Sequence, residues 1–400
     1  MKVLELFAGI GACSKALERL GIKVDYADVV EIDKYAIKSF NAIHDTNFEV
    51  QDITKYDKEI DVDLIMHGSP CQDFSIAGRQ KGGNQGSGTR SSLMYETIRI
   101  VEQIKPKYIL WENVKNILSK KHKHNFDNYI NMLDSLGYNS YYKILNAKDY
   151  GIPQNRERVF TVSIRKDIDK GNFIFPEKQE LKMRLKDILE EKVDKKYYLS
   201  DDVASKYVQS KKNNTNVIGN LIMDKWQDSM KRIYDIEKYS PAINTMQGGN
   251  LEPKIITHNI PQKVKVRKYD EKGITPTLIQ QEEKMLINNN NTKKGYDEAV
   301  EGDSINLQYP NSKTRRGRVG HQVSQTIMAK GEIGVIEKNL GYKIRKLTPK
   351  ECWRLMGFDD KDFYKAKDAG ISDTQLYRQA GNSIVVNVLE SIFKNLFLKE

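Results

Sequence analysis

Residues 2–20 read KVLELFAGIGACSKALERL, and this stretch sets the organisation of the first third of the chain. The apolar run VLELF predicts a buried strand. CSKALERL predicts a helix, because Ala16, Leu17 and Leu20 recur on one helical face. Glycines between the two let the backbone turn tightly and approach a ligand closely beside the helix N-terminus. A strand, a glycine turn and a helix in this order are typical of a doubly wound α/β domain.

The same alternation continues along the chain. Further strands are predicted over 24–30, 62–66, 107–112, 139–145 and 158–164, and helices over 35–43 and 92–104. Near-continuous apolar strands separated by helices indicate a parallel sheet that is covered on both faces. Helical periodicity returns after residue 343, in TPKECWRLMGF and NSIVVNVLESIFKNLFL.

The composition changes near residue 180, where the sequence becomes polar, Asn-rich and strand-like. Three segments there resemble one another: PAINTMQGGN (241–250), ITPTLIQQEE (274–283) and VSQTIMAKGE (323–332). They predict similar β-hairpins, with chance likeness of Thr-rich strands as the alternative. We therefore expect an α/β catalytic and cofactor-binding domain formed by 1–180 and 341–400, and a smaller, mainly β domain over 181–340.

Positive charge is concentrated in one region of the chain. The 400 residues carry a formal charge of +11, yet residues 1–150 hold 20 Lys+Arg against 20 Asp+Glu. Residues 251–350 hold 19 against 11. Regional basicity predicts a polyanion partner and salt-sensitive binding, although solubility alone would also explain it.

Cysteine usage and hydropathy limit the class of protein. Cys13, Cys71 and Cys352 lie far apart without a C-x-x-C pair, which disfavours a disulfide framework or a zinc site. The start of the sequence lacks a signal-peptide layout, and no apolar run approaches membrane-spanning length. The sequence thus predicts a cytoplasmic protein with no metal and no membrane contact.

Several motifs fall at expected strand ends, the edge at which open α/β folds carry their chemistry. FAGIG (7–11) follows the first strand. Glu31 of VVEID ends the second, where a carboxylate can accept hydrogen bonds from a ribose, and Asp52 of VQDI is expected to end the next, where it could read an adenine amine. Each acid taken singly is an ordinary solvated strand-end residue; three such features on successive strands favour a nucleotide-type ligand.

Cys71 lies in HGSPCQDFS (67–75), directly after the apolar run VDLIM. A cysteine that only fills space would sit inside that run, whereas Cys71 follows it, where the backbone leaves the sheet. This position predicts a nucleophile, with a buried inert thiol as the alternative. The polar, glycine-rich stretch 73–92 is long for a strand-to-helix connection and predicts a lid over the site, or a passive loop.

FAGIG, EID, QDI, GSPCQDFS, WENV, QNRER, RKLTPKECWRLMGF and YRQAGNSIVVNV occur in the order and rough spacing of one family. In these blocks the chain resembles the C5-cytosine DNA methyltransferases of bacterial and phage restriction–modification systems. The blocks frame 1–165 and 340–400, and the stretch between falls where that family carries its variable target-recognition region. The resemblance implies S-adenosylmethionine as cofactor and C5 of cytosine in double-stranded DNA as the methylated carbon.

The resemblance also implies roles for the catalytic positions. Cys71 would add to C6 of a flipped-out cytosine, because a thiolate is a soft nucleophile and a good leaving group. Glu112 of WENV would hold or protonate N3, and Asn113 would orient the site. In QNRER, Arg158 would contact the base O2, and Arg156 would lie near the cysteine and a phosphate.

Two larger sets of residues complete the implied site. The positions matching the cofactor motifs are Phe7, Ala8, Gly9, Ile10, Gly11, Glu31, Ile32, Asp52, Ile53, Pro70, Leu93, Asn382 and Ser383. The candidate DNA contacts are Gln72, Ser75, Arg79, Thr245, Thr277, Arg315, Arg316, Arg318 and Thr326. The departures from the family pattern are mild: Glu5 stands for an aspartate, Ala12 for a glycine, and Ile32 offers adenine an aliphatic surface.

Some alternatives stay open from sequence alone. An RNA cytosine-5 methyltransferase, or a DNA-binding regulator that kept the fold and lost turnover, would share much of this pattern. Intact Cys71, Glu112 and Arg158 argue against lost turnover, and the long basic insertion favours duplex DNA. We expect a monomer, and a separately encoded cognate endonuclease is left open. The recognition sequence cannot be derived, because direct readout depends on which side chains reach base edges.

Overall fold

A computed structural model of the chain describes residues 1–70, 74, 82–84, 86–197 and 342–398, together with short strands between residues 217 and 335. The chain forms two compact units. The first comprises Met1–Glu191, Tyr239–Glu252 and Thr348–Glu400, and the second comprises Lys192–Lys238 and Pro253–Leu347. The first unit is therefore assembled from stretches that are far apart in sequence.

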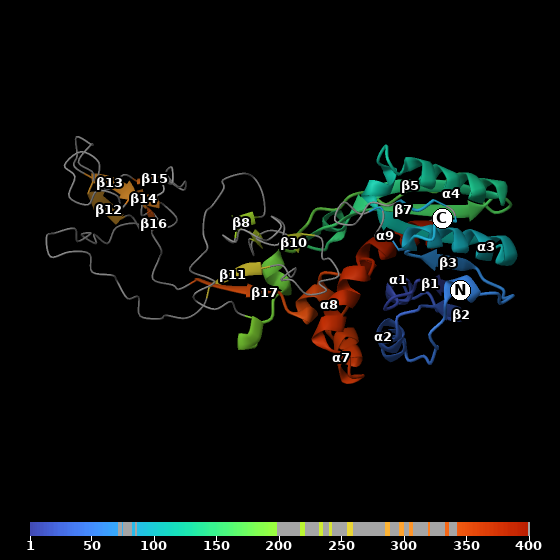
Figure 1. Cartoon of the computed structure of the whole chain (residues 1–400), viewed down its shortest axis with the longest axis horizontal. Coiled ribbons are helices and arrows are strands. Elements are labelled where there is room, and N and C mark those ends of the chain that lie inside the picture. Colours follow the sequence, from blue (N-terminus) through green and yellow to red (C-terminus); the bar gives the residue numbers. More distant parts are fainter. Residues whose placement is uncertain are drawn as a thin grey trace. The chain divides into compact units, whose positions relative to one another are not determined.

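A six-stranded sheet in the spatial order β2–β1–β3–β4–β7–β5 forms the centre of the first unit (Figure 1). Its strands are β1 (Lys2–Leu6), β2 (Asp25–Val30), β3 (Leu64–His67), β4 (Tyr108–Val114), β5 (Tyr138–Asn146) and β7 (Glu157–Arg165). The predicted strands over 62–66, 107–112, 139–145 and 158–164 are confirmed to within a few residues. The α/β class is confirmed as well.

The sheet is mixed: the parallel pairing expected of the first four strands is confirmed, and the antiparallel direction of β7 was not predicted. β1 to β4 pair in parallel, whereas β7 runs antiparallel to both β4 and β5. The physical reason is the short link between β5 and β7, which holds only the single turn η4 (Ala147–Tyr150) and β6 (Gln154–Asn155). Parallel pairing needs a crossover of a dozen or more residues. The start of β7 consequently lies beside the end of β4.

Helices cover the sheet. They are α1 (Ala12–Arg19), α2 (Lys34–His44), α3 (Met94–Ile104), α4 (Lys123–Ser135), α6 (Pro349–Arg354), α7 (Asp360–Asp368), α8 (Asp373–Asn382) and α9 (Val386–Phe397). Single 3-10 turns are η1 (Ile53–Lys55), η2 (Arg90–Leu93), η3 (Lys115–Leu118), η5 (Leu185–Ile188) and η6 (Lys195–Tyr197). Helix α4 was not predicted, because lysine, histidine and asparagine surround its buried face of Phe126, Tyr129 and Leu133.

The core of the first unit follows the alternation of the strands. Side chains from α3 and α4 pack with Leu4, Ile65 and Trp111 on one face of the sheet. On the other face, α2 packs against Val29, and α1 contacts α9. Alternate residues of one strand therefore point toward different helical layers, so neighbouring side chains of β4 lie on opposite faces of the sheet.

The second unit is described through residues 192–197, which include η6, and through its strands. These are β8 (Val217–Asn220), β9 (Arg232–Tyr234), β11 (Lys254–His258) and β17 (Tyr342–Lys346) in one sheet, the pair β12 (Met285–Asn288) and β13 (Tyr296–Ala299), and β14 (Ser304–Asn306) with β15 (Val319–Gly320) and β16 (Ile333–Val335). β10 (Ser240–Pro241) pairs with β6 inside the first unit. Thr245, Thr277, Thr326, Arg315, Arg316 and Arg318 lie outside the described residues.

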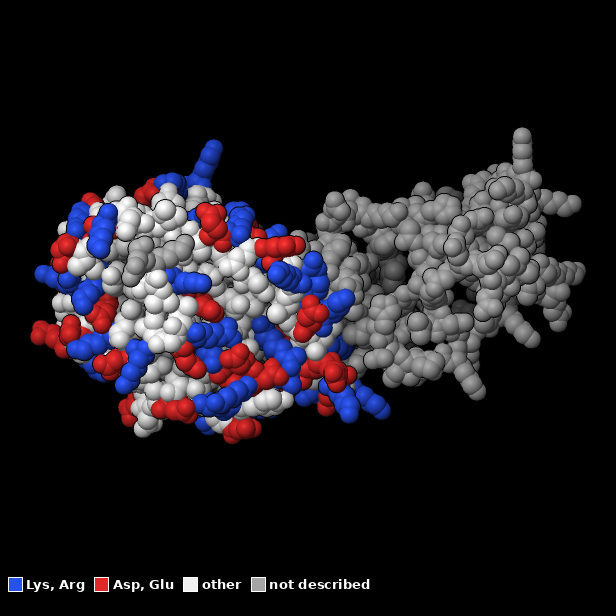
Figure 2. Space-filling view, turned by 180° about the vertical axis from the view of Figure 1, so that it is seen from behind, with Lys and Arg blue, Asp and Glu red and all other residues white. Residues whose placement is uncertain are grey.

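The described surface carries charges of both signs. On the face of the first unit seen in Figure 2, lysine and arginine side chains are interspersed with aspartate and glutamate. Among the helices of the described residues, none has the length and apolar character needed to cross a membrane.

A buried ion pair joins the two ends of the chain. Lys15 of α1 places its Nζ 3.1 Å from an Asp362 oxygen and 3.1 Å from Asp359, and the Lys15 and Asp362 side chains are only 8% and 5% exposed. Beside it, Arg19 donates to the carbonyl of Gly357 at 2.6 Å. The C-terminal helices are thus fixed to the first helix by charge as well as by apolar packing.

We predict that Lys15→Met lowers the free energy of unfolding by about 3 kcal/mol, because it leaves the Asp362 carboxylate buried without its cation. Chemical denaturation measures this loss. The matched control is Lys2→Met, which removes the exposed Lys2–Asp61 pair and should leave the unfolding free energy unchanged within error. Equal losses in the two variants would contradict the assignment.

His67 ends β3 inside the core, immediately before the segment that carries Cys71. Its ring is fully buried and stacks on Trp111, with centroids 5.8 Å apart. Its Nε2 lies 2.8 Å from the Tyr129 hydroxyl. Burial lowers the pKa of His67 from 6.5 to about 3, so the imidazole is neutral at physiological pH.

This lowered pKa predicts a specific acid sensitivity. Between pH 6.5 and 3 the unfolded chain binds a proton at His67 that the folded chain does not. Stability is therefore full above 6.5 and falls as the pH decreases through this window, by about 2 kcal/mol on reaching pH 5. His67→Gln should flatten this part of the stability–pH curve. An imidazole NMR resonance of His67 that titrates near 6.5 would refute the burial effect.

Candidate active site

The turn after β1 opens the carboxyl edge of the sheet. Gly9 has a φ of +57°, and a Cβ added there would meet no atom within 4 Å, so the backbone faces open space. Gly11 serves a different purpose, since a Cβ there would lie 2.1 Å from the His44 ring. Ala8 donates its N–H to the carbonyl of Val30 at 3.3 Å. Gly9 thus leaves room for a ligand, while Gly11 allows close packing of α2.

The residues after β2 lie against this turn. Glu31 accepts hydrogen bonds from the N–H of Gly9 at 2.9 Å and of Asp33 at 2.8 Å. Burial of the carboxyl group raises the pKa of Glu31, although both N–H donors oppose this change. The Ile32 side chain beside it is 67% exposed. An acid and an open aliphatic surface at one turn suit the ribose and the base of a nucleoside.

Asp52 does not end a strand, which corrects the sequence expectation. It begins η1, and its carboxylate accepts from the N–H of Thr54 at 3.0 Å and from the Thr54 hydroxyl at 2.9 Å. Local side-chain bonds of this kind compete with strand pairing. The backbone hydrogen bond from Gln51 to Glu31, 3.0 Å long, still keeps Asp52 next to the β2 edge, while Ile53 is buried in the core.

Glu112 and Arg158 meet where β4 ends and β7 begins. Arg158 Nε lies 3.0 Å from Glu112 Oε1, and both side chains are largely shielded, at 19% and 11% exposure. The antiparallel register places Val114 opposite Arg158, so Glu112 is its diagonal neighbour on the same face. A small pocket opens here, lined by Glu112, Ala147, Arg156, Arg158, Phe160, Ile384, Val385 and Val388.

The opposite face of β4 anchors the segment before Cys71. Trp111 Nε1 donates to Ser69 Oγ at 2.9 Å, and Asn113 Nδ2 donates to the same oxygen at 3.2 Å. Ser69 is 4% exposed and lies two residues before Cys71. Sequence analysis missed Ser69 and Trp111. The period of two along WENV, in which Trp111 and Asn113 flank Glu112, was the available signal.

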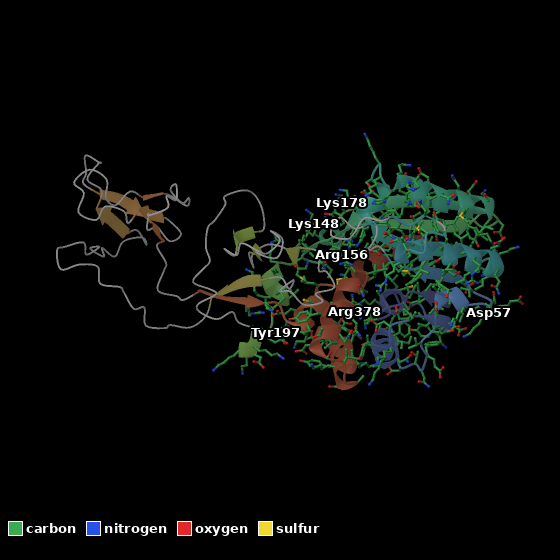
Figure 3. The ribbon with its side chains drawn as sticks, viewed as in Figure 1. Asp57, Lys148, Arg156, Lys178, Tyr197 and Arg378 are labelled. Carbon is green, nitrogen blue, oxygen red and sulfur yellow. The ribbon has the colours of Figure 1, made fainter. Side chains whose placement is uncertain are left out.

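Arg156 lies in the interior. Its guanidinium donates to the carbonyls of Gly381 at 3.2 Å and Ser383 at 2.8 Å, and the residue is 5% exposed (Figure 3). These two hydrogen bonds fix the turn after α8 to the start of β7, and the expected place of Arg156 near the cysteine and a phosphate stays a prediction. Ser383 is buried at that turn and Asn382 is exposed. Their contact with a cofactor stays a prediction.

Helix α8 also contacts the turn after β2. Arg378, labelled in Figure 3, belongs to this helix. Its Nη1 lies 3.1 Å from Asp33 Oδ2. Gln379 donates to the Tyr35 carbonyl at 2.9 Å and accepts from the Ser39 hydroxyl at 3.1 Å. The YRQAGNS motif (377–383) therefore contacts the EID motif (31–33) and the start of α2, although more than 340 residues separate Tyr35 from Gln379.

The remaining predicted positions differ in how far the structure describes and exposes them. Pro70 is half-buried, Leu93 packs partly buried against the core, and Phe7 has a φ of +53° at the start of the glycine turn. Ile10 is buried, at 1% exposure. The residues outside the described part of the chain are Cys71, Gln72, Ser75 and Arg79.

The other two cysteines cannot serve as the nucleophile. Cys13 is 1% exposed and Cys352 is fully buried. Burial, together with the nearby Glu5, raises the pKa of the Cys13 thiol well above its usual value. A thiol in such surroundings stays protonated and unreactive.

Comparison with known proteins identifies the family. A family model described as C-5 cytosine-specific DNA methylase matches residues 1–398. The orphan methyltransferase M.SPRI of Bacillus phage SPR is 33% identical over 99% of this chain and 97% of its own length. The type II methyltransferase M.HhaI of Haemophilus parahaemolyticus is 30% identical over 99% of this chain and 94% of its own length.

Solved structures agree on the fold. The Dnmt2 methyltransferase of S. pombe superposes with a TM-score of 0.59 over 100% of this chain and 98% of its own, at 17% identity. A putative DNA modification methyltransferase from an E. coli prophage gives a TM-score of 0.56 at 18% identity, covering 100% and 99%. These likenesses concern the fold alone. Because the family model and the relatives both extend over almost the entire sequence, this chain belongs to the C-5 cytosine-specific DNA methylases.

Proposed function

We propose that this DNA (cytosine-5-)-methyltransferase performs its chemistry at the carboxyl edge of the six-stranded sheet, with Cys71, Glu112 and Arg158 acting on the base. The observation that carries the proposal is the Glu112–Arg158 pair, 3.0 Å apart at the wall of a pocket. The same strand that presents Glu112 also holds Ser69, two residues from Cys71. A nucleophile and an acid are therefore tied to one element.

The chemistry requires both groups because cytosine C5 is a poor nucleophile within an aromatic ring. Addition of the Cys71 thiolate forms an S–C6 bond and drives negative charge toward N3 and O2. Glu112 holds or protonates N3, and the Arg158 guanidinium donates to O2. When bound, S-adenosylmethionine supplies a methyl group on an electrophilic sulfonium. Once C5 carries the methyl group, a proton leaves C5 and the S–C6 bond breaks, which returns the electron pair to Cys71.

The cofactor contacts are supported by the geometry of the first two turns. Gly9 offers backbone beside open space, Glu31 offers carboxylate oxygens, and Ile32 offers an exposed aliphatic surface. Asp52 lies beside Glu31 through the Gln51 hydrogen bond. This donor and acceptor set fits the adenosine part of S-adenosylmethionine. Leu93, Pro70, Asn382 and Ser383 are proposed to complete the site.

The substrate is proposed to be double-stranded DNA from which the target cytosine is rotated out, because C5 and C6 are inaccessible in the stack. The second unit, with the basic stretch KTRRGR, is proposed as the target-recognition domain. We propose a cytoplasmic monomer. Names of the relatives divide between orphan and type II methyltransferases, so a separately encoded endonuclease stays a proposal.

A suicide-substrate assay tests the function. Wild-type protein with S-adenosylmethionine should form a covalent complex with duplex DNA containing 5-fluorocytosine, since fluorine at C5 leaves no proton to remove. Cys71→Ser should form none, and the buried Cys13→Ser should trap normally. The complex is scored by denaturing electrophoresis. Bisulfite sequencing of a plasmid expressed with the protein supplies the recognition site for the duplex. Trapping on RNA but never on DNA would refute the DNA assignment.

Ser69 provides a sharper test of how the site is held together. Ser69→Ala leaves the N–H groups of Trp111 and Asn113 buried without their acceptor, which frees the segment before Cys71. We expect kcat to fall by about tenfold, a barrier increase of about 1.4 kcal/mol, with KM for the cofactor unchanged.

Two further variants serve as controls for Ser69→Ala. Ser69→Thr, which keeps the hydroxyl, should restore most of kcat. Ser163→Ala removes another buried serine, whose hydroxyl contacts Ser140 at 2.7 Å away from the pocket. That variant should lower stability without changing kcat. A kcat loss that simply follows the loss of thermal stability in both alanine variants would remove the positioning role.

A further inference from the structure

A basic segment begins directly where β4 ends. Residues 115–124, here called the basic turn, read KNILSKKHKH and contain four lysines, two histidines and no acid. They form η3, the connection that follows it and the start of α4. Because they follow Val114 at the end of β4, they lie at the same edge of the sheet as Glu112 and the pocket.

Neighbouring acids balance some of the charge of the basic turn. Lys115 pairs with Glu157 at 3.0 Å, and Lys123 pairs with Asp127 at 2.6 Å. Lys120 and Lys121, between these pairs, are exposed. The pKa of the neighbouring His122 is lowered first by burial and then by the nearby Lys121 and His124. With four lysines and no acid, residues 115–124 carry a net positive charge.

The basic turn also contacts the segment that follows Cys71. Asn116 Nδ2 donates to the carbonyl of Phe74 at 2.6 Å, and the His122 ring meets the Phe74 ring edge-on, with centroids 5.3 Å apart. His124 Nε2 lies 2.9 Å from Asn84 Oδ1. The lysines are thus fixed in place beside the stretch that leads away from the nucleophile.

We propose that the basic turn is a docking surface for the sugar–phosphate backbone of the DNA, with Lys120 and Lys121 facing phosphates next to the flipped cytosine. The inference rests on the proposed function, because it needs the base to enter at Glu112. A base held at the end of β4 brings its own phosphates to the residues just beyond that strand. Lysine contacts of this kind position the duplex and carry no sequence information. The surface therefore adds affinity independently of the target-recognition unit.

Salt dependence of binding tests the proposal on the full chain. The variant Lys120→Gln/Lys121→Gln should bind a duplex containing the recognition site more weakly. The slope of log Kd against log salt between 50 and 200 mM should decrease by roughly 2, because each phosphate that is no longer neutralised by a lysine removes about 0.9 from the slope. A duplex without the site should show the same change in slope.

The matched control removes two exposed lysines at the opposite edge of the sheet. Lys105 follows α3 just before β4, and Lys170 lies beyond the end of β7, whose Ile164 is opposite Tyr108. Lys105→Gln/Lys170→Gln should keep the wild-type slope. Equal slopes in both double variants would overturn the docking surface and make the turn a solvated face, while leaving the methyltransferase function intact. Failure of wild type to trap DNA would overturn both.

Discussion

Two hydrogen bonds to one buried oxygen connect strand β4 to the end of the segment that follows β3. Ser69 Oγ accepts from Trp111 and Asn113, which flank Glu112 on β4. Side chains alternate along a strand. Glu112 therefore points toward the pocket, while Trp111 and Asn113 point to the other face, toward Ser69. The acid and the segment leading to Cys71 are therefore set by one strand, and a shift of β4 by one residue would exchange their faces.

Contacts between residues distant in sequence complete both halves of the site. Arg156 holds the carbonyls of Gly381 and Ser383 beside the pocket, while Arg378 pairs with Asp33 beside the cofactor turn. The Glu112–Arg158 pocket and the turn after β2, the proposed base and cofactor sites, are thus both contacted by the region around the end of α8. This arrangement explains why the conspicuous motif YRQAGNS can matter to both ligands without being a nucleophile or an acid.

Sequence reasoning located most of the sheet and the motifs that follow its strands, because apolar runs and glycine turns are local signals. It failed where tertiary context decides. The direction of β7 depends on the length of the connection before it. Asp52 caps a 3-10 turn instead of pairing in the sheet, and the buried residues of α4 are interspersed with polar ones. The period of two along WENV was a signal for Trp111 and Asn113, but their acceptor Ser69 is recognised only from the structure. Arg156 was placed in the right motif, but its burial could not be foreseen.

Because the first unit is built from three separate stretches of sequence, it cannot be complete until the last of them has been synthesised. Lys15 and Arg156 leave the ribosome early, yet their partners Asp362, Gly381 and Ser383 come after the whole second unit has been translated. A nascent polypeptide holding only the N-terminal stretch would lack these acceptors for the Lys15 ammonium and the Arg156 guanidinium. Assembly of the first unit is therefore completed late, when the C-terminal helices emerge and pack onto α1, α2 and η4.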